Sequence, residues 1–368
     1  MAALQRGEID WLLTPNADLV DSLRKSPGVT VRVAFPLGSV SCLRFNWLQP
    51  PFDRAEIRRA VLPAIIQADY MTAMNGDDRT RWRDNVGYFC PGMPMANDAG
   101  LEALTGPRSL EAARRNLAAA GYKGERVVLL APGDVPYAKI LAEVTADLLK
   151  RTGFNVDLQA MDWGTLVQRR AKQDPLDKGG WSVFHTNWTG ADQGTPATHV
   201  FLRGNGRAAA PGWPDIPRME QLRDAWLGAA DQATQLGIAR EMQALAFQEI
   251  PYIPLGQMIS ATAHRSDLVG MVPNQVAFWN VRRAGEPEPA TTDARHNRGT
   301  RQVVVGAAAH RRRRGEALGL HGCEQTEGTG CECDAGRCGT GGEKGAASLK
   351  RWGHRGLSSH AHAHVPHG

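Results

Sequence analysis

The sequence predicts an α/β fold over its first 283 residues, followed by a segment that cannot form a core. The first observation is the spacing of apolar residues between positions 53 and 256, which changes repeatedly between strand-like and helix-like periods. The second is the composition of residues 284–368, where only nine of 85 are Val, Leu, Ile, Met, Phe, Trp or Tyr. So few large apolar side chains cannot offset the entropy lost on folding. We therefore expect a globular part and a disordered, low-complexity tail.

The first regular element in this pattern is a helix over residues 54–68. Asp53, followed three positions later by Glu56, resembles a capping box. Pro63 should bend this helix or shift its last turns, because proline removes a backbone donor. The apolar residues that define the helix recur every four positions and are Ile57, Val61 and Ile65.

A strand, a helix and a second strand follow between residues 127 and 158. An apolar run at Val127–Leu130 ends at Pro132 and Gly133, and a second run with alternating polarity follows Gly153. The helical face between them consists of Ile140, Leu141, Val144, Leu148 and Leu149. A connecting helix favours parallel pairing of the two strands, so we predict a β-α-β unit.

Two helices are predicted next, at residues 219–230 and 232–249, from their apolar spacing. The segment YIPLGQ after them is strand-like, but Pro251 and Pro254 flank or interrupt it. Since proline cannot donate to a sheet ladder, we expect this segment at a surface or a sheet edge.

Charge and hydropathy exclude several classes. Of the net charge of +5, the tail contributes +3, and its only dense basic run is Arg311–Arg314, which we interpret as a solvated charge run rather than a nucleic-acid site. We expect no membrane span, since no apolar stretch approaches about 20 residues, and the N-terminus lacks a signal-peptide pattern. Only Cys42 and Cys90 lie in the globular part, too few to argue for or against disulfides.

The stretch 181–206 carries the strongest indication of a binding site. It places Trp181, Trp188 and Asp192 among glycines and small polar residues. The carboxylate could accept a charge-assisted hydrogen bond from an ammonium group, and the indoles could provide apolar faces that attract cations. Gly190 and Gly194 would let the backbone approach a ligand. The alternative is that both tryptophans are core residues and Asp192 only stabilises a turn.

Several blocks in this order resemble a known family. They are FNWLQPPFDRAEIRRAV, the strand–helix–strand from Val127 to Trp163, the loop around Trp188 and Asp192, and AFQEIPYIPLGQ. Together they resemble the later part of the bacterial extracellular solute-binding proteins of family 5. The resemblance implies a two-lobed, periplasmic-binding-protein-like α/β fold of type II, with one lobe largely intact and the other partial. It divides the chain into 1–45 (partial first lobe), 46–260 (ligand-binding lobe), 261–283 (return to the first lobe) and 284–368 (tail).

The resemblance also implies roles for individual residues. In relatives that bind peptides, an aspartate after a tryptophan and four residues before a proline receives the ligand's amino terminus. Asp192 and Pro196 keep that spacing, although one extra residue separates Trp188 from Asp192. Trp188 would then stack on the ligand, and Asn187 and Thr189 would reach its polar atoms. For the carboxylate end of a peptide the candidates are Tyr137 and Lys139, with a surface role as the alternative.

The function that the resemblance implies is solute binding for a peptide-type ABC importer, by a monomer that works with permease subunits in the periplasm. It implies no catalysis, cofactor or metal. Family members are longer than this chain, so we expect an incomplete copy; without a signal peptide it would remain cytoplasmic if made as written.

A second interpretation assigns the function to the tail, as a metal- or nucleic-acid-binding segment. Cys333 and Cys338 have a spacing loosely compatible with zinc, whereas Cys331 lies too near Cys333, and the alternating His360, His362 and His364 could hold nickel or copper. We favour instead translation of a shifted reading frame in GC-rich DNA, which explains the Arg, Gly, Ala and His bias.

An enzyme is the class that the sequence supports least. The chain contains no G-x-S-x-G, H-E-x-x-H, phosphate-loop or G-x-G-x-x-G pattern. His185 lies near Asp192 in the sequence but has no nucleophile partner, so we predict a packed strand residue.

Overall fold

The computed structural model describes residues 1–15, 17–272 and 280–285. The chain divides into two units, Met1–Gly299 and Thr300–Gly368, and all described residues belong to the first. The predicted tail lies almost entirely outside the described residues, and so do its candidate cysteines, histidines and Arg311–Arg314. The boundary predicted near residue 284 therefore stays a prediction.

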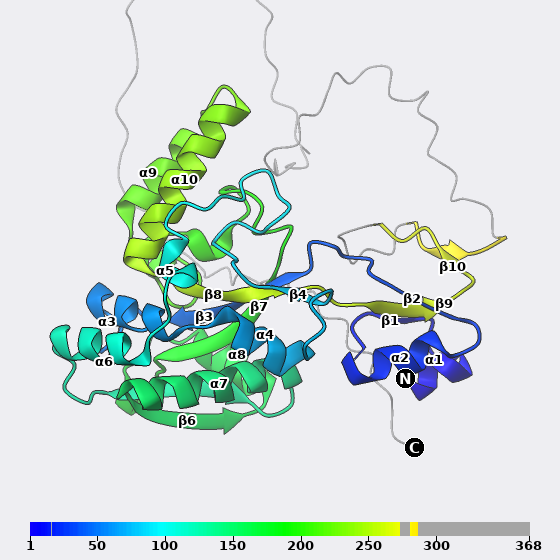
Figure 1. Cartoon of the computed structure of the whole chain (residues 1–368), viewed down its shortest axis with the longest axis horizontal. Coiled ribbons are helices and arrows are strands. Elements are labelled where there is room, and N and C mark those ends of the chain that lie inside the picture. The colour runs from blue at the N-terminus through cyan, green and yellow to red at the C-terminus, as the bar shows by residue number, and fades with distance from the viewer. Residues whose placement is uncertain (16, 273–279, 286–368) are drawn as a thin grey trace, which may run out of the picture. The chain divides into compact units, whose positions relative to one another are not determined.

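The first unit is built around a mixed six-stranded sheet with the order β4-β8-β3-β7-β5-β6 (Figure 1). β5 runs parallel to β6 and β7, whereas β3 runs antiparallel to both β7 and β8. The strands are β3 (Ser39–Phe45), β4 (Trp82–Arg83), β5 (Arg126–Pro132), β6 (Asn155–Met161), β7 (Val183–Thr189) and β8 (Tyr252–Met258).

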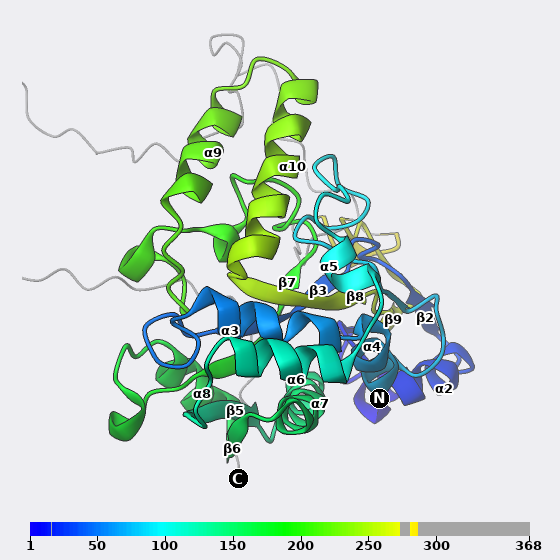
Figure 2. The same ribbon diagram turned by 60° about the vertical axis from the view of Figure 1, so that its left-hand side comes forward.

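Helices cover both faces of this sheet, because alternate residues of β5 are apolar on each side. Val127 and Leu129 belong to the large core that contains the inner face of α7, and Val128 and Leu130 belong to a second cluster with Leu166 of α8. The helices of this part are α3 (Ala55–Ala60), α4 (Gln67–Asn75), α5 (Glu102–Thr105), α6 (Leu110–Ala119), α7 (Pro136–Thr152), α8 (Trp163–Arg170), α9 (Pro217–Leu227) and α10 (Gln232–Glu249). Figure 2 shows α3, α6 and α7 on the same side of the sheet, and α9 beside α10.

A smaller sheet with the order β1-β9-β2 contains strands from the beginning and from the end of the globular part. Its core is small and consists of Leu4, Leu23 and Ala263, with partly buried neighbours. Its elements are α1 (Ala2–Arg6), β1 (Trp11–Leu12), α2 (Val20–Arg24), β2 (Val29–Arg32) and β9 (Thr262–Arg265), and the short pair β10 (Leu268–Val269) and β11 (Arg282–Arg283) follows. Short 3-10 turns complete the chain at Ala17–Leu19, Leu62–Ala64, Leu176–Lys178, Val200–Leu202 and Gly206–Ala208.

The chain passes between the two sheets at residues 33–38 and again at 259–261. The boundary predicted near residue 260 falls in the second passage. The boundary predicted after residue 45 falls beyond β3, which belongs to the larger sheet. β3 thus shares a sheet with the strands of the predicted ligand-binding lobe, and the predicted lobe boundaries stay predictions.

The predicted β-α-β unit is confirmed as β5, α7 and β6, with parallel register from Arg126–Asn155 to Pro132–Met161. The helix predicted over 232–249 matches α10, and the one predicted over 219–230 matches α9 within a few residues.

The single helix predicted over 54–68 is wrong. α3 ends at Ala60, a 3-10 turn that contains Pro63 follows, and Ile65 is extended before α4 begins. The capping box is also absent, because Arg54 is the N-cap and Glu56 pairs with Arg59 instead. Pro63 thus divides the segment rather than bending it, as expected when a proline clashes with the preceding turn.

The edge position predicted for YIPLGQ is also wrong, because β8 is buried between β4 and β3. β4 pairs only with Met258 and Gln257, so no strand faces Pro254 on that side. The carbonyl of Pro254 accepts a hydrogen bond from the Gln67 side chain at 2.8 Å. A proline fits here because, on that side of β8, side chains rather than a strand cover the backbone. The missing N–H of Pro254 therefore removes no hydrogen bond between strands.

Candidate ligand-binding site

The candidate site lies where β7 ends. Asn187, Trp188 and Thr189 are partly or fully exposed, although the preceding residues of β7 are buried. Since β5, β6 and β7 are parallel, their carboxyl ends lie at one edge of the sheet, where ligands commonly bind in open α/β sheets. Asn187, Trp188 and Thr189 lie at this edge, and Asp192 lies in the turn that follows it.

Asp192 is held in place by Thr189. The Thr189 hydroxyl donates to Oδ2 of Asp192 at 2.7 Å and accepts the Asp192 backbone N–H at 3.2 Å. Asp192 is partly exposed, and no Lys, Arg or His among the described residues forms an ion pair with it. An oriented carboxylate without a cationic partner is a natural acceptor for a ligand's ammonium group.

The glycines of the loop serve a different purpose from the one predicted. The Gly190 N–H donates to the Gly38 carbonyl at 2.9 Å, and a Cβ at Gly190 would lie 2.2 Å from the carbonyl oxygen of Leu37. A Cβ at Gly194 would lie 2.1 Å from Cε of Met93. Both glycines therefore allow the loop to pack against its own chain, which corrects the expectation that they admit a ligand.

Trp188 and Asn187 each contact a neighbouring side chain and remain partly exposed to solvent. The Trp188 ring lies 4.9 Å from the Phe201 ring, centroid to centroid, and its indole N–H has no hydrogen-bond partner in the described part of the chain. Asn187 accepts a hydrogen bond from the Ser41 hydroxyl at 2.8 Å through Oδ1.

Tyr137 meets the same strand from α7. Its phenol interacts with the Thr186 side chain and the Asn187 backbone, and burial, the dominant effect, raises its pKa. Lys139 is exposed and pairs with Glu143 on its own helix at 3.2 Å. The structure therefore brings Tyr137 to the predicted site residues, whereas Lys139 has the surface environment given as the alternative.

Trp181 is excluded from this group. Its side chain is 0% exposed and packs against Phe184 and Trp213, with ring centroids 5.0 and 5.7 Å away. A fully enclosed indole has no face to offer a ligand. The core alternative therefore holds for Trp181, although not for the partly exposed Trp188.

His185 is a packed strand residue, as predicted. It is 1% exposed, and its Nε2 lies 2.8 Å from the hydroxyl oxygen of Thr145 in α7. Burial lowers its pKa to about 3, so the ring is neutral at neutral pH.

Three neighbours of the site were missed by sequence analysis: Ser41, Thr186 and Arg170. Each lies far along the chain from at least one residue that it touches, for example Ser41 from Asn187. Arg170 reaches the Phe184 ring from the end of α8. Pairing of β3 with β7 is the signal that would have located Ser41, but it is not visible in either strand alone.

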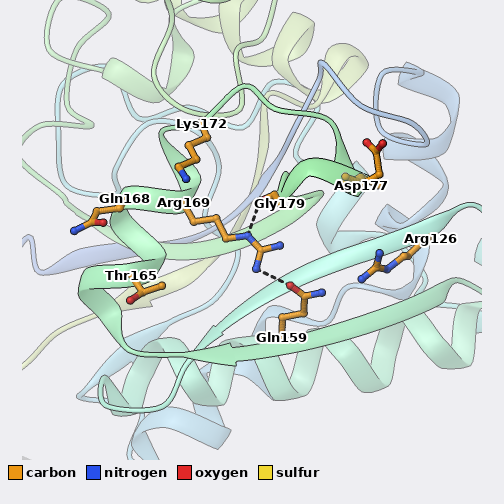
Figure 3. Close-up of a pocket in the computed structure, with 9 residues that line it drawn as sticks. Arg126, Gln159, Thr165, Gln168, Arg169, Lys172, Asp177 and Gly179 are labelled. Carbon is orange, nitrogen blue, oxygen red and sulfur yellow. Dashed lines mark hydrogen bonds between the residues drawn. The ribbon is translucent and has the colours of Figure 1, made fainter.

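A surface cavity of about 500 Å³ is lined by residues of α8, of the strands β5 and β6, and of the segment 172–179, and Figure 3 shows these residues. Its cations are largely engaged. Arg169 donates to the Gln159 side chain and to the carbonyls of Gly179 and Gly180, and Arg126 pairs with Asp157. None of the predicted ligand residues lines this cavity.

An open α/β sheet with an oriented carboxylate at its strand ends is typical of proteins that bind small solutes. The chain belongs to the bacterial extracellular solute-binding proteins of family 5, whose model for the middle region matches residues 1–208. The predicted family is thereby confirmed.

Curated relatives are peptide-binding proteins by name. The chain is 34% identical over 285 residues to a probable peptide ABC transporter periplasmic-binding protein of Sinorhizobium fredii, covering 77% of this chain and 54% of the relative. It is 26% identical over 281 residues to di/tripeptide-binding protein 2 of Pseudomonas aeruginosa, covering 73% and 49%. The chain thus spans about half the length of the curated relatives it matches.

Solved structures confirm the predicted two-lobed periplasmic-binding-protein fold class. The periplasmic binding protein DppA of Helicobacter pylori, in complex with the peptide STSA, matches with a TM-score of 0.64 at 21% identity, over 77% of this chain and 54% of that one. The dipeptide-binding protein of Pseudoalteromonas sp. SM9913, in complex with Met-Leu, matches with a TM-score of 0.62 at 18% identity, over 77% and 55%. Within the described residues, no helix combines the length and apolar content needed to cross a bilayer.

Proposed function

We propose that this chain belongs to the substrate-binding component of a peptide-type ABC importer and binds a short peptide or related solute. It acts by binding alone, without catalysis, as a periplasmic monomer that delivers its ligand to permease subunits. The names of the relatives support a peptide ligand, since those proteins are described as peptide- or di/tripeptide-binding. The interpretation based on the tail gains no support, because its residues lie outside the described structure.

The observation that carries the proposal is the environment of Asp192. Its Oδ2 is fixed by the Thr189 hydroxyl, while Oδ1 has no hydrogen-bond partner among the described residues. The half-open indole of Trp188 lies four residues earlier in the chain. A peptide ammonium can therefore form a charge-assisted hydrogen bond to Asp192, and we expect the partly exposed Trp188 ring to contact the ligand as well.

Replacing Asp192 with asparagine should lower the affinity for trialanine about 30-fold, or about 2 kcal/mol, because the ammonium loses its charged acceptor. Titration calorimetry of the full chain would measure this change. N-acetyl-trialanine, which has no ammonium, should bind both proteins with similar weak affinity.

The matched control is Asp147→Asn, which removes an exposed carboxylate that pairs only with Arg151 on the surface of α7. This variant should bind trialanine like the wild type. Unchanged affinity in Asp192→Asn would remove Asp192 from the site, whereas failure of the wild type to bind any peptide from a random tripeptide mixture would overturn the proposed function itself.

A further inference from the structure

The cavity of Figure 3 lies over a part of the larger sheet that is unusually polar. On the face that packs against α8, Val128 and Leu130 of β5 belong to the apolar cluster. Their register partners in the outer strand β6 are Asp157 and Gln159, which share that face because paired residues of a sheet point to the same side. Arg126, at the start of β5, lies on this face as well. The outer part of the face is therefore a polar floor, and Arg126 and Gln159 line the cavity above it.

Arg169 of α8 is fixed to this floor by hydrogen bonds. Its Nη1 donates to Oε1 of Gln159 at 2.6 Å, and its Nε and Nη2 donate to the carbonyls of Gly179 and Gly180 at 2.7 and 2.9 Å. These bonds use three of the five N–H groups of the guanidinium, and all three acceptors are neutral. Arg169 is therefore held in place while its charge has no ion-pair partner among the described residues.

Asp157 balances only one of the two guanidinium groups on the floor. Nε of Arg126 donates to its Oδ2 at 2.9 Å, and the Gln159 side chain donates to the same oxygen at 2.6 Å. The hydrogen bond from Arg126 lowers the pKa of Asp157, so this carboxylate is ionised at neutral pH. Asp157 also attracts the charge of Arg169. A single negative charge is thus shared by two arginines.

A third cation, Lys172, reaches the cavity from the turn that follows α8. One side of this helix and turn carries polar residues at spacings of three and four, which are Thr165, Gln168, Arg169 and Lys172. The Lys172 ammonium forms neither an ion pair nor a hydrogen bond with the described part of the chain. In Figure 3 the cationic groups of Lys172, Arg169 and Arg126 follow one another across the cavity.

The charges around the cavity favour an anion that carries more than one negative charge. Three cations face two carboxylates, Asp157 on the floor and the exposed Asp177. A phosphate dianion matches this surplus, and its oxygens can accept from the unused N–H groups of Arg169 and from Lys172. The cavity volume of about 500 Å³ lies within the range of small-molecule sites, so there is room for a polar group attached to the phosphate.

We propose that this cavity is a second binding site, which takes a small phosphate ester. The phosphate lies between Arg169 and Lys172, and the side chains of Thr165 and Gln168 face the rest of the molecule. This site does not depend on the proposed function, because none of the candidate peptide-binding residues lines it. It also lies beside the starts of β5 and β7, whereas Asp192 follows the end of β7.

The test is titration calorimetry on the full chain, at constant ionic strength and in a buffer without phosphate, with inorganic phosphate, glycerol 3-phosphate and glucose 6-phosphate as probes. All three should bind, and at least one ester should bind about 10-fold more tightly than inorganic phosphate. Lys172→Gln should weaken binding of that ester about 10-fold, because a charge-assisted hydrogen bond is lost, and Lys172→Arg should restore it. Asp177→Asn should strengthen binding about 3-fold, since a repelling charge is removed.

Lys178→Gln is the matched control, because it removes an exposed cation next to Asp177 that does not line the cavity. It should keep ester binding within about 2-fold of the wild type, and circular dichroism would verify that each variant is folded. Absence of binding of all three probes, or equal losses in Lys172→Gln and Lys178→Gln, would overturn this inference while leaving the proposed function intact. Esters that bind no more tightly than inorganic phosphate would show a site for the free ion and would overturn the assignment to an ester. Displacement of a bound ester by trialanine would show one shared site and would likewise overturn it.

Discussion

Replacing Arg44 with methionine is expected to lower the free energy of unfolding by about 5 kcal/mol, among the largest effects of a single substitution. Arg44 lies in β3, is 0% exposed and has no carboxylate partner within the described residues. Its guanidinium donates instead to four backbone carbonyls, those of Pro211, Phe201, Pro251 and Ala210, at 2.8 to 3.3 Å. Methionine fills much of the same space but leaves these carbonyls buried without a donor.

Urea unfolding followed by circular dichroism would measure the loss. Arg115→Met is the control, because Arg115 is exposed and pairs only with Glu111 on the surface of α6; its loss should cost less than about 0.5 kcal/mol. Arg44→Lys should be intermediate, since an ammonium can reach some of the carbonyls. A loss below about 1 kcal/mol in Arg44→Met would show that the four hydrogen bonds, three of which reach the 200–216 region, contribute little to stability.

Lowering the pH from 7 to 5 is expected to reduce the free energy of unfolding by about 4 kcal/mol through two buried histidines. Burial lowers the pKa of His185 and of His199 to about 3, against 6.5 in an unfolded chain. Between these values the unfolded chain binds more protons than the folded one, so stability is complete above about pH 6.5 and is lost as the pH falls. Most carboxylates remain ionised at pH 5, which makes this window specific for histidine.

Urea titrations at pH 7, 6 and 5 would measure this dependence. His185→Gln should lose about half of it, because glutamine can replace the bond to Thr145 but does not titrate. His199, whose Nε2 lies 2.8 Å from the Tyr88 carbonyl oxygen, accounts for the other half. A pH dependence that is the same in His185→Gln and the wild type would contradict a buried, neutral His185.

The elements that the sequence predicted correctly are those whose signal is local. The helix α10 and the β5-α7-β6 unit each have an apolar face and end at glycine, proline or a capping residue within the same segment. The helix over 54–68 failed because its apolar spacing continues through Pro63, whereas the backbone does not. The prediction that β8 lies at a sheet edge failed because residues far along the chain, such as Gln67 and Tyr88, cover this strand. The sequence YIPLGQ contains no information about them.

The site divides in the same way. Asn187, Trp188, Thr189 and Asp192 are close in sequence, so their proximity follows from the strand and its turn. Trp181 looked equivalent to Trp188, but its burial depends on Trp213, which only the folded chain brings to it. Arg170 was missed because its contact with Phe184 forms only when α8 packs against β7.

The position of β3 has a consequence for how this chain folds. β3 is central to the six-stranded sheet, and its two partners lie far along the chain, at residues 183–189 and 252–258. The entropy cost of closing such long loops arises before the strands gain any stability from pairing. High contact order therefore slows folding. The β5-α7-β6 unit can form early from local contacts, whereas β3 gains its first partner only with β7 and keeps an open edge until β8 has been synthesised. Folding of this protein should therefore pass through a populated intermediate in which the future centre of the sheet is still an open edge, a state prone to association.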